Sequence, residues 1–348
     1  MLRMLSNQLG ERQSLTTTQV RDAVGQLTDE GVPAHIKAVF LTRLAEKGET
    51  IEEIAAFASE ILKVSVRPEL PSSLRDQDIL DVCGTGGDRL NTFNISTTVA
   101  LAVSAAGVPV AKHGNRAITS ASGSADVLEA LGIRIDLPPA EAVRWLGEHR
   151  FAFFFAPQYH PGFRHIAPAR KLCAEKGQRT LFNFLGPLLN PARPTAQLLG
   201  VSRPHLCEPL ARVLQSLGAR RAMVVCGEAQ DAWLDELSTL GKNTIAEFYQ
   251  AKGFAISLLS PSDLPLQPAR LDDLIGGDKF ANAAIIRKLL EGADRGPRRD
   301  AVLLNAGAAL FIAGKAKSLG EGWDQIAQVI DSGRAIQHLR ALIAASAL

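Results

Sequence analysis

Glycine-rich and hydroxyl-bearing loops in the first half of the chain have the residue types that bind phosphate. The first loop, GTGGD at 84–88, follows a short apolar strand expected at 79–83. Glycines let the backbone turn tightly and bring its N–H groups close to an anion. The motif fits neither GxGxxG nor GxxxxGK[ST], so the sequence does not indicate a dinucleotide or ATP fold. The glycines alone fit a plain turn between a strand and a helix equally well.

Two further polar loops favour a phosphate site. The residues NIST at 94–97 begin an apolar helix, and the free N–H groups at a helix N-terminus attract phosphate. Either Ser96 or Thr97 would also suit an ordinary N-cap. KHGNR at 112–116 follows a second expected strand at 108–111. Further hydroxyl groups follow at Thr119, Ser120, Ser122 and Ser124. Because the carboxyl ends of parallel strands meet at one edge of a sheet, these loops together predict one site for several phosphates.

A pair of adjacent carboxylates, Asp235 and Glu236, has the chemistry of a magnesium site. Apolar residues flank the pair in the sequence WLDELS. Mg²⁺ takes oxygen ligands, keeps several waters and commonly bridges to substrate phosphates. Two other acidic motifs compete for this role. Asp272-Asp273 is expected on a helix surface, and the Asp of GGD at 276–278 is expected to cap the next helix. We assign neither of them to the site.

Other kinds of catalytic site find no support in the sequence. It contains no legible Ser-His-Asp arrangement and no CxxC or HExxH motif. His160 and His165 lie in a proline-rich segment without metal-ligand companions, so packing or surface roles are expected for both. The four cysteines are widely scattered, and we expect reduced thiols in a cytosolic protein.

Length and composition describe an ordinary globular protein. The 348 residues are 46% hydrophobic and 21% charged, which argues against disorder and allows a large core. The 38 Lys and Arg nearly balance the 36 Asp and Glu, so net charge gives no general attraction to nucleic acid. No segment looks like a membrane span, and the first residues lack the apolar stretch of a signal peptide. We therefore expect a cytoplasmic protein without nucleic-acid or membrane partners.

The elements that must position these loops change in kind along the chain. Up to residue 65 the apolar residues recur at helical spacing, Thr50 and Glu53 form a capping-box pattern, and no strand is expected. A linker at 67–78 follows. Strands and helices then alternate, which predicts an α/β fold with a largely parallel, buried sheet. Further strands are expected at 151–156 and 222–226, with helices from there to the C-terminus.

A proline-rich segment between residues 157 and 204 interrupts this alternation. It holds seven of the 18 prolines of the chain, interleaved with several basic residues. We expect irregular backbone there, and long ordered loops are more often functional than idle.

In their order and spacing, these motifs resemble those of the anthranilate phosphoribosyltransferase family. The resemblance covers essentially the whole chain, and it implies a nucleoside phosphorylase/phosphoribosyltransferase-like fold with a small, mostly helical N-terminal domain and a larger α/β domain. The helical domain would span 1–70, joined by part of 164–196, and the α/β domain would span 75–348. The motifs that carry the resemblance are GTGGD at 84, NIST at 94, KHGNR at 112, SGSADVLEALG at 122, FNFLGPLLNPA at 182 and DELS at 235.

The resemblance also implies the ligands. Enzymes of this family join anthranilate to phosphoribosyl pyrophosphate (PRPP) in tryptophan biosynthesis, usually as homodimers. Mg²⁺ would be held by Ser96, Asp235 and Glu236. We assign no general acid or base, because the aromatic amine of anthranilate is already neutral near pH 7. The residues that would surround PRPP are Gly84, Gly87, Asp88, Thr92, Asn94, Ile95, Ser96, Thr97, Lys112, His113, Gly114, Asn115, Arg116, Ala117, Ile118, Thr119, Ser120 and Ser124.

By the same resemblance, anthranilate would contact Gly84, Asn115 and Arg170, with Arg170 facing its carboxylate. The segment between Arg170 and Gly186 is longer than the family pattern, in a region where substrate contacts concentrate. A phosphoribosyltransferase or nucleoside phosphorylase with a different acceptor therefore stays an alternative, as does a non-catalytic paralogue that binds nucleic acid. The Asp235-Glu236 pair counts against a phosphorylase. The intact GTGGD loop and the net charge of +2 count against the paralogue.

Overall fold

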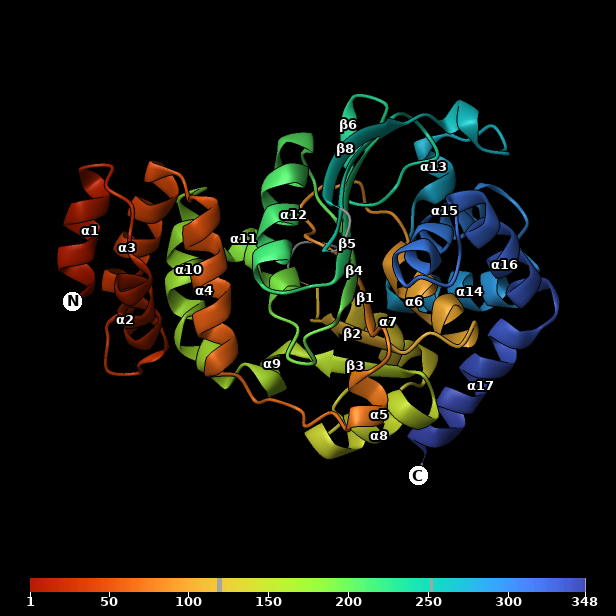
Figure 1. The fold of residues 1–348 in the computed structure, drawn as a ribbon, viewed down its shortest axis with the longest axis horizontal. Helices are drawn as coiled ribbons and strands as arrows, with labels where there is room; N and C mark the ends of the chain where they lie inside the picture. Colours follow the sequence, from red (N-terminus) through yellow and green to blue (C-terminus); the bar gives the residue numbers. More distant parts are fainter. Residues whose placement is uncertain (118–120, 251–252, 348) are drawn as a thin grey trace.

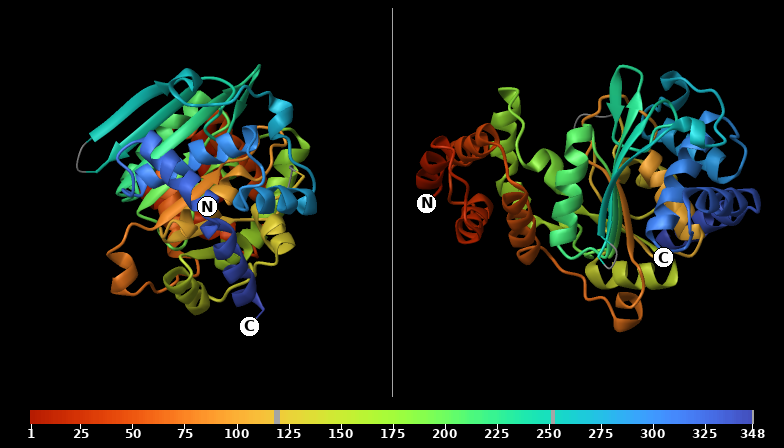
Figure 2. Two further views of the ribbon diagram at one scale, coloured as in Figure 1. Left: turned by 90° about the vertical axis from the view of Figure 1, so that its right-hand side faces the viewer. Right: turned by 45° about the horizontal axis from the view of Figure 1, so that its top comes forward.

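The computed structural model describes residues 1–117, 121–250 and 253–347 (Figure 1). A small helical domain lies beside a larger domain in which helices cover both faces of one sheet. Figure 2 shows the same two parts from two further sides, with the sheet seen nearly edge-on in its right-hand view. The predicted fold class, a helical domain with a largely parallel α/β domain, is confirmed.

Four N-terminal helices pack with one helix from the middle of the chain. As predicted, the described residues up to 65 contain no strand, and the Thr50–Glu53 capping box is present. The buried Lys37 ammonium donates to the carbonyl of His165 at 2.9 Å, so a distant segment helps to complete the core of these helices. The helices are α1 (Leu2–Gly10), α2 (Thr17–Thr28), α3 (Ala34–Lys47), α4 (Ile51–Lys63) and α10 (Ala167–Glu175), which packs against α3.

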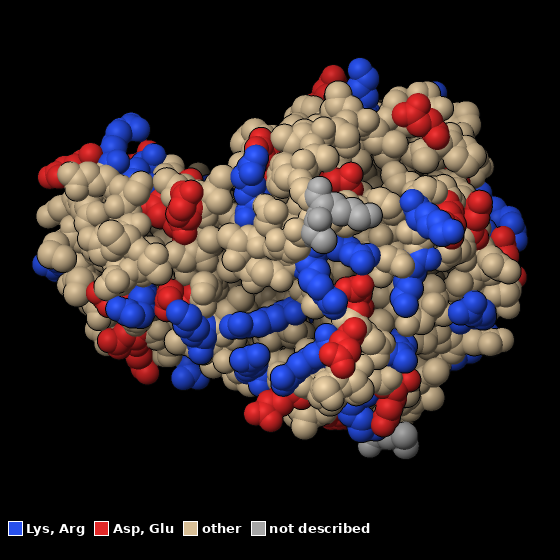
Figure 3. Space-filling view, viewed as in Figure 1, with Lys and Arg blue, Asp and Glu red and all other residues tan. Residues whose placement is uncertain are grey.

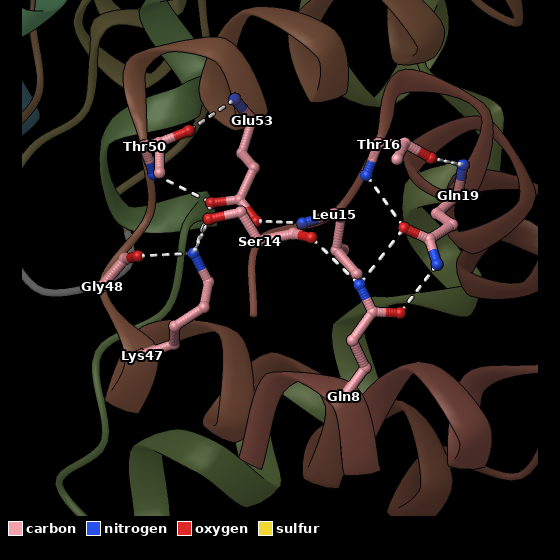
Figure 4. A network of polar contacts seen from close by, with 9 residues as sticks. All are labelled: Gln8, Ser14, Leu15, Thr16, Gln19, Lys47, Gly48, Thr50 and Glu53. Atoms are coloured by element: carbon pink, nitrogen blue, oxygen red, sulfur yellow. Dashed lines mark hydrogen bonds and ion pairs between the residues drawn. The ribbon is translucent and has the colours of Figure 1, made fainter. Parts of the chain in front are cut away.

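A buried ion pair ties two loops of the helical domain together (Figure 4). The Glu53 carboxylate accepts from Leu15 N at 2.8 Å, from Thr50 N at 2.9 Å and from Lys47 Nζ at 2.6 Å. The side chains of Lys47 and Glu53 are only 4% and 1% exposed. One carboxylate therefore holds the α1–α2 loop against the α3–α4 loop.

The central sheet has the strand order β3-β2-β1-β4-β5-β7-β8, and β6 pairs with β5. Its parallel strands are β3 (Phe151–Phe155), β2 (Val110–Gly114), β1 (Leu80–Gly84), β4 (Ala196–Gly200) and β5 (Arg221–Ala229). The strands β6 (Ala232–Leu234), β7 (Asn243–Tyr249) and β8 (Gly253–Leu259) are antiparallel to their neighbours. The loops that follow β1, β2 and β4 therefore lie at one edge of the sheet.

Helices pack on both faces of the sheet, with a buried apolar cluster on each side. In Figure 1, α12 (Cys207–Ser216) lies on the face toward the helical domain. The opposite face carries α6 (Ile95–Ala105), α14 (Lys279–Leu290), α15 (Pro297–Ile312), α16 (Leu319–Asp331) and α17 (Arg334–Ser346). The remaining helices outside the proline-rich segment are α5 (Ser72–Arg75), α7 (Ser124–Leu131), α8 (Pro139–Glu148), α13 (Leu271–Leu274) and the 3₁₀ turn η4 (Pro261–Asp263).

The strands differ from the sequence predictions at three places. The central parallel strand β4 lies within 157–204, where irregular backbone and no strand was expected. The strand expected at 108–111 runs from Val110 to Gly114, so Lys112 and His113 lie within the strand instead of following it. The ladder begins only after Pro109, which has no N–H to donate. The prediction of helices alone after residue 226 was wrong, because β7 and β8 form a hairpin at the edge of the sheet. Most of β8 is exposed, so it lacks the apolar alternation that marks a half-buried strand.

The segment 157–204, expected to be irregular, consists largely of short helical turns. Prolines occupy the first turn of most of them, where a missing N–H costs no hydrogen bond. In this segment the prolines therefore mark the first turns of helices, and the prediction of irregular backbone was wrong. Besides α10, the turns are α9 (Ala156–Tyr159), η1 (Pro161–His165), α11 (Phe182–Leu185), η2 (Gly186–Leu188) and η3 (Pro204–Leu206).

The surface carries both signs of charge. On the face shown in Figure 3, Lys and Arg side chains are more frequent across the lower centre, with Asp and Glu between them. No helix in the described part of the chain is long and apolar enough to cross a membrane. All four cysteines are free and buried, so the prediction of unpaired thiols is confirmed.

The docking of α17 on α6 makes one pH-dependent contribution to stability. His338 Nε2 lies 2.9 Å from the hydroxyl of Ser104, and the pKa of His338 is lowered to about 4 by burial and by the nearby His149. The unfolded chain has the higher pKa, near 6.5, so this stability is complete above pH 6.5 and declines as pH falls toward 4. When the pH falls from 7.5 to 5, the free energy of unfolding of the wild-type protein should decrease by about 2 kcal/mol more than that of His338→Asn.

Urea unfolding followed by circular dichroism at the two pH values measures this difference. The exposed His35 provides the control, because His35→Asn should leave the pH dependence of wild type unchanged. Parallel pH profiles for wild type and His338→Asn would contradict the assignment.

Candidate active site

The loop 84–88 turns at the carboxyl end of β1 and contacts a carboxylate from the other half of the domain. Gly86 and Gly87 have φ angles of +71° and +83°, a region that favours glycine. The Gly86 N–H donates to Asp235 Oδ2 at 2.6 Å. The loop therefore presents backbone N–H to negative charge, as an anion-binding turn does.

Three glycines make room for the connection between β6 and β7. A Cβ on Gly84 or Gly200, which end the paired strands β1 and β4, would overlap atoms of Asp235. A Cβ on Gly227 in β5 would overlap Ser238. Glycine at these positions lets the connection lie directly over the carboxyl ends of the parallel strands.

The half-buried Asp235 and the buried Glu236 form a pair with concentrated negative charge. Burial raises the pKa of both carboxyls, and the nearby Asp88 raises each further. Two opposing effects favour charged Glu236: Lys112 lies nearby, and Glu236 Oε1 accepts the Ser96 N–H at 3.1 Å. A bound cation would stabilise two carboxylates that otherwise repel one another where little water screens them.

The oxygen atoms present fit Mg²⁺ that shares a phosphate ligand. In the described ranges, no three His, Cys, Asp or Glu side chains form a metal-binding group. Two carboxylates and the Ser96 hydroxyl would supply only part of a ligand set. Mg²⁺ typically completes such a set with waters and substrate phosphate oxygens. The competing acidic motifs behave as expected: Asp272 and Asp273 are exposed on α13, and Asp278 caps α14.

Lys112 places a buried ammonium at the same edge of the sheet. The residue is 1% exposed, and its Nζ donates to the Val82 carbonyl at 2.7 Å and lies 3.4 Å from Ser96 Oγ. Burial lowers the pKa of Lys112, and Asp81 opposes that effect. Burial also raises the pKa of Asp81 to about 6, although Lys112 and an amide of Asn190 favour its charged form. These groups hold a positive charge beside the start of α6.

The N-terminus of α6 adds a polar cradle. Asn94 is the N-cap, but its side chain makes no cap bond and instead links Ser122 O, at 3.2 Å, with Asn282 Nδ2, at 2.9 Å. The hydroxyl of Thr97 is buried and has no hydrogen-bond partner among the described residues. An unpaired hydroxyl at the positive end of a helix suits an anionic ligand. Just before the helix, Thr92 bridges to Ile275.

The loop after β2 is braced from α7. Arg116 pairs with both Glu129 and Asp126, and the Ala117 N–H donates to Asp126 Oδ2 at 2.9 Å. Asn115 is exposed, and its carbonyl accepts from Ser124 Oγ at 3.4 Å. The predicted PRPP residues Ile118, Thr119 and Ser120 lie outside the described residues.

A column of rings leads from β2 to Arg170 on α10. The ring of His113 lies 5.3 Å from that of His160, which stacks on Phe163 at 5.0 Å. Phe163 meets Phe182 edge-on at 5.6 Å, and the Arg170 guanidinium lies 5.6 Å from the Phe182 ring. Burial lowers the pKa of Arg170, and no carboxylate in the described chain pairs with it. His160 therefore packs, as predicted, and Arg170 is a half-buried cation without a carboxylate partner among the described ion pairs.

Comparison with known proteins agrees with this architecture. A model described as the helical bundle domain of a glycosyl transferase family matches residues 4–65, and one described as the a/b domain of a glycosyl transferase family matches 76–336. The anthranilate phosphoribosyltransferase of Geotalea uraniireducens (strain Rf4) is 44% identical over 344 residues, 96% of each chain. The chain belongs to the anthranilate phosphoribosyltransferase family.

Solved members of the family share the whole fold. The enzyme from Thermus thermophilus superposes with a TM-score of 0.89 and is 40% identical, over 99% of both chains. The Saccharomyces cerevisiae enzyme in complex with PRPP and Mg gives a TM-score of 0.86 at 28% identity, over 99% of this chain and 98% of that one. Among curated relatives, the enzyme of Lacticaseibacillus casei (strain BL23) is 47% identical over 309 residues, 89% of this chain and 87% of that one. The resemblance seen in the motifs is thereby confirmed.

Two residues beside the Asp235-Glu236 pair were not predicted from the sequence. Asn305 on α15 and Asn243 on β7 are fully buried and hydrogen-bond the backbone directly after Asp235 and Glu236. A signal for Asn305 was present, since it is a lone polar residue within the apolar run of α15 at 301–312. Buried polar residues of that kind are expected to have specific hydrogen-bond partners. Asn243 carried no comparable signal.

Proposed function

We propose that the protein transfers the phosphoribosyl group of PRPP to the amine of anthranilate, releasing pyrophosphate, in tryptophan biosynthesis. One observation carries this proposal within the family. At one edge of the sheet, the Asp235-Glu236 pair, Lys112 and the N-terminus of α6 meet the GTGGD loop. Cationic and anionic groups arranged in this way fit a magnesium-bound pyrophosphate.

We propose that PRPP binds across the loops 84–97 and 112–124. Bound Mg²⁺, held by Ser96, Asp235 and Glu236, would neutralise charge on the departing pyrophosphate. Lys112 adds a positive charge held in place by the Val82 carbonyl, so the site needs little reorganisation as charge develops. The Mg complex of the yeast relative supports the choice of ion.

The acceptor is proposed to bind at Gly84, Asn115 and Arg170. Arg170 is suited to the carboxylate of anthranilate, because a half-buried guanidinium without a carboxylate partner can pair with a planar anion. Burial lowers the pKa of His113 to about 3 and that of His160 to about 4, so both rings are neutral at pH 7. The column of rings between Arg170 and β2 therefore carries no positive charge that would draw the anthranilate carboxylate away from Arg170.

Arg170→Ala should weaken anthranilate recognition selectively. Loss of a charged hydrogen-bond donor should raise KM for anthranilate by roughly 10- to 150-fold, equivalent to about 1.5–3 kcal/mol. KM for PRPP should change far less, because its proposed contacts lie on other loops. Steady-state kinetics with each substrate varied in turn measures both values.

The neighbouring exposed residue gives a matched control. Lys171→Ala removes a positive charge from the same helix and should leave both KM values within about twofold, the scale of an exposed charge. Equal losses for both substrates in Arg170→Ala, or no loss for either, would remove Arg170 from the acceptor site.

A direct assay tests the proposed function as a whole. The purified protein with PRPP and Mg²⁺ should remove anthranilate fluorescence at a rate that depends on all three components. Consumption of PRPP with another aromatic amine but not with anthranilate would move the assignment to a different acceptor.

We also propose a cytoplasmic homodimer with two domains, residues 1–70 with part of 164–196 and residues 75–348. Four free cysteines support a reducing compartment, and the packing of α10 against α3 supports the division of the chain. Size-exclusion chromatography with light scattering tests the dimer.

A further inference from the structure

Asn305 binds both polar groups of one backbone unit next to the carboxylates. Its Oδ1 accepts the Leu237 N–H at 2.9 Å, and its Nδ2 donates to the Leu237 carbonyl at 2.9 Å. The same Nδ2 donates to Ala301 O on its own helix, at 2.9 Å. Asn305 is fully buried in α15, which packs against β4, β5 and α6. The position of Leu237 is therefore tied to a rigid helix.

Asn243, in strand β7 of the sheet, binds both backbone polar groups of the next residue, Ser238. Its Oδ1 accepts the Ser238 N–H at 2.7 Å, and its Nδ2 donates to the Ser238 carbonyl at 3.0 Å. Asn243 is also fully buried, at the start of β7. The Ser238 hydroxyl adds a bond of 2.5 Å to the Glu228 carbonyl of β5. Two consecutive backbone units are thus clamped, one by a helix and one by the sheet.

We call Asn305 and Asn243 together the clamp. They hold the backbone beside Asp235 and Glu236, where electrostatic repulsion favours displacement of the chain. Glu236 is buried and Asp235 is half-buried; their carboxylates repel one another, and Asp88 repels both. If the connection between β6 and β7 moved away from the sheet, water would solvate both carboxylates. Leaving Leu237 or Ser238 without its asparagine would instead bury an unpaired N–H and an unpaired carbonyl, each of which is costly. The clamp therefore opposes the electrostatic repulsion.

We propose that Asn305 and Asn243 are positioning residues that fix Asp235 and Glu236 for the metal ion. In this proposal neither asparagine is itself a ligand of the ion or of the substrates. Each acts through the backbone of Leu237 or Ser238, and the two act from different elements. This inference rests on the proposed function, because it requires that the two carboxylates hold Mg²⁺ with PRPP.

Mn²⁺ binding measured by electron paramagnetic resonance, with PRPP present, tests the clamp without turnover. Asn305→Ala and Asn243→Ala should each weaken Mn²⁺ binding by about tenfold or more, the usual effect of losing a residue that orients a ligand. In kinetics, added Mg²⁺ should restore much of the lost rate. Leu310→Ala, a cavity in the same buried helix, is the control and should keep wild-type Mn²⁺ affinity despite a lower melting temperature.

Asn305→Asp keeps the test decisive if an alanine variant fails to fold. This near-isosteric change retains an acceptor for the Leu237 N–H but loses the donor to its carbonyl, so weaker Mn²⁺ binding is again expected. Wild-type Mn²⁺ affinity in the folded variants, or an equal loss in Leu310→Ala, would overturn the positioning role. Absence of PRPP-dependent Mn²⁺ binding in the wild-type protein would instead contradict the proposed function.

Discussion

Asp235→Asn combined with Glu236→Gln should reduce kcat/KM by at least about 1,000-fold, because both charges that would hold the metal are lost. The two changes are near-isosteric. The pKa of each carboxyl is raised in the folded protein, so the charged forms cost stability there. The melting temperature of the metal-free variant should therefore not fall. Mg²⁺-dependent kinetics and thermal unfolding without metal together measure both effects.

The chain provides a matched acidic control. Asp272→Asn combined with Asp273→Asn neutralises an equal number of adjacent carboxylates on the exposed surface of α13. This variant should keep activity within about threefold of wild type, as expected for exposed charges. Near-normal turnover by the Asp235/Glu236 variant would show that the pair is only a buried acidic turn.

Glu53→Gln should destabilise the helical domain by about 3–5 kcal/mol, the cost of leaving one partner of a buried ion pair without its counter-charge. The Lys47 ammonium is 4% exposed and has no other carboxylate among its described ion pairs. A glutamine oxygen would keep part of the bonding to Leu15 and Thr50 but could not neutralise Lys47. Urea unfolding followed by circular dichroism gives the change in free energy.

An exposed ion pair in the same domain is the control, because it shows how much stability is lost when an ion pair that is not buried is broken. Arg43 and Glu46 form a salt bridge with side chains 52% and 50% exposed. Glu46→Gln should cost less than about 1 kcal/mol. Replacing Lys47 by Met in the Glu53→Gln background should recover part of the loss, since the buried ammonium is then removed. Similar small losses for Glu53→Gln and Glu46→Gln would refute the argument.

The placement of the phosphate-compatible loops could be predicted from the sequence because parallel strands all end at the same edge. The GTGGD loop and the start of α6 follow one strand, and KHGNR belongs to the next, so the alternation of elements alone put them together. The structure confirms that Gly86 and Ser96 both reach the Asp235-Glu236 pair. The roles of these residues toward PRPP, Mg²⁺ and anthranilate stay predictions.

The environment of Lys112 could not be predicted, because local pattern does not show how far a strand extends. The apolar stretch ends before Lys112, yet the ladder continues through Gly114 and places the lysine under α6. Its burial depends on Asp81 and Asn190, which come from other parts of the chain. A buried charge is recognisable only when the groups that pair with it are known.

The asparagine clamp and the β7–β8 hairpin were missed for a related reason. Both depend on contacts between distant segments: Asn305 on α15 hydrogen-bonds the backbone of Leu237, and β8 pairs with β7 while most of its own residues are exposed. Apolar periodicity records which face of an element is buried and says nothing of its hydrogen-bond partners. Long-range polar contacts of this kind lie beyond what spacing in one sequence can show.

The packing of α10 against α3 has a consequence for synthesis of the chain. Helices α1–α4 leave the ribosome before β1, β2 and β3, but Ile166, Ala169 and Cys173, which complete their core, follow only after these strands. At about 5–20 residues per second, the N-terminal helices wait roughly 5 to 20 seconds with an apolar surface uncovered. We expect the nascent chain to expose this surface to ribosome-associated chaperones during that interval. The helical domain is thus begun before the α/β domain and completed only after three strands of that domain have been made.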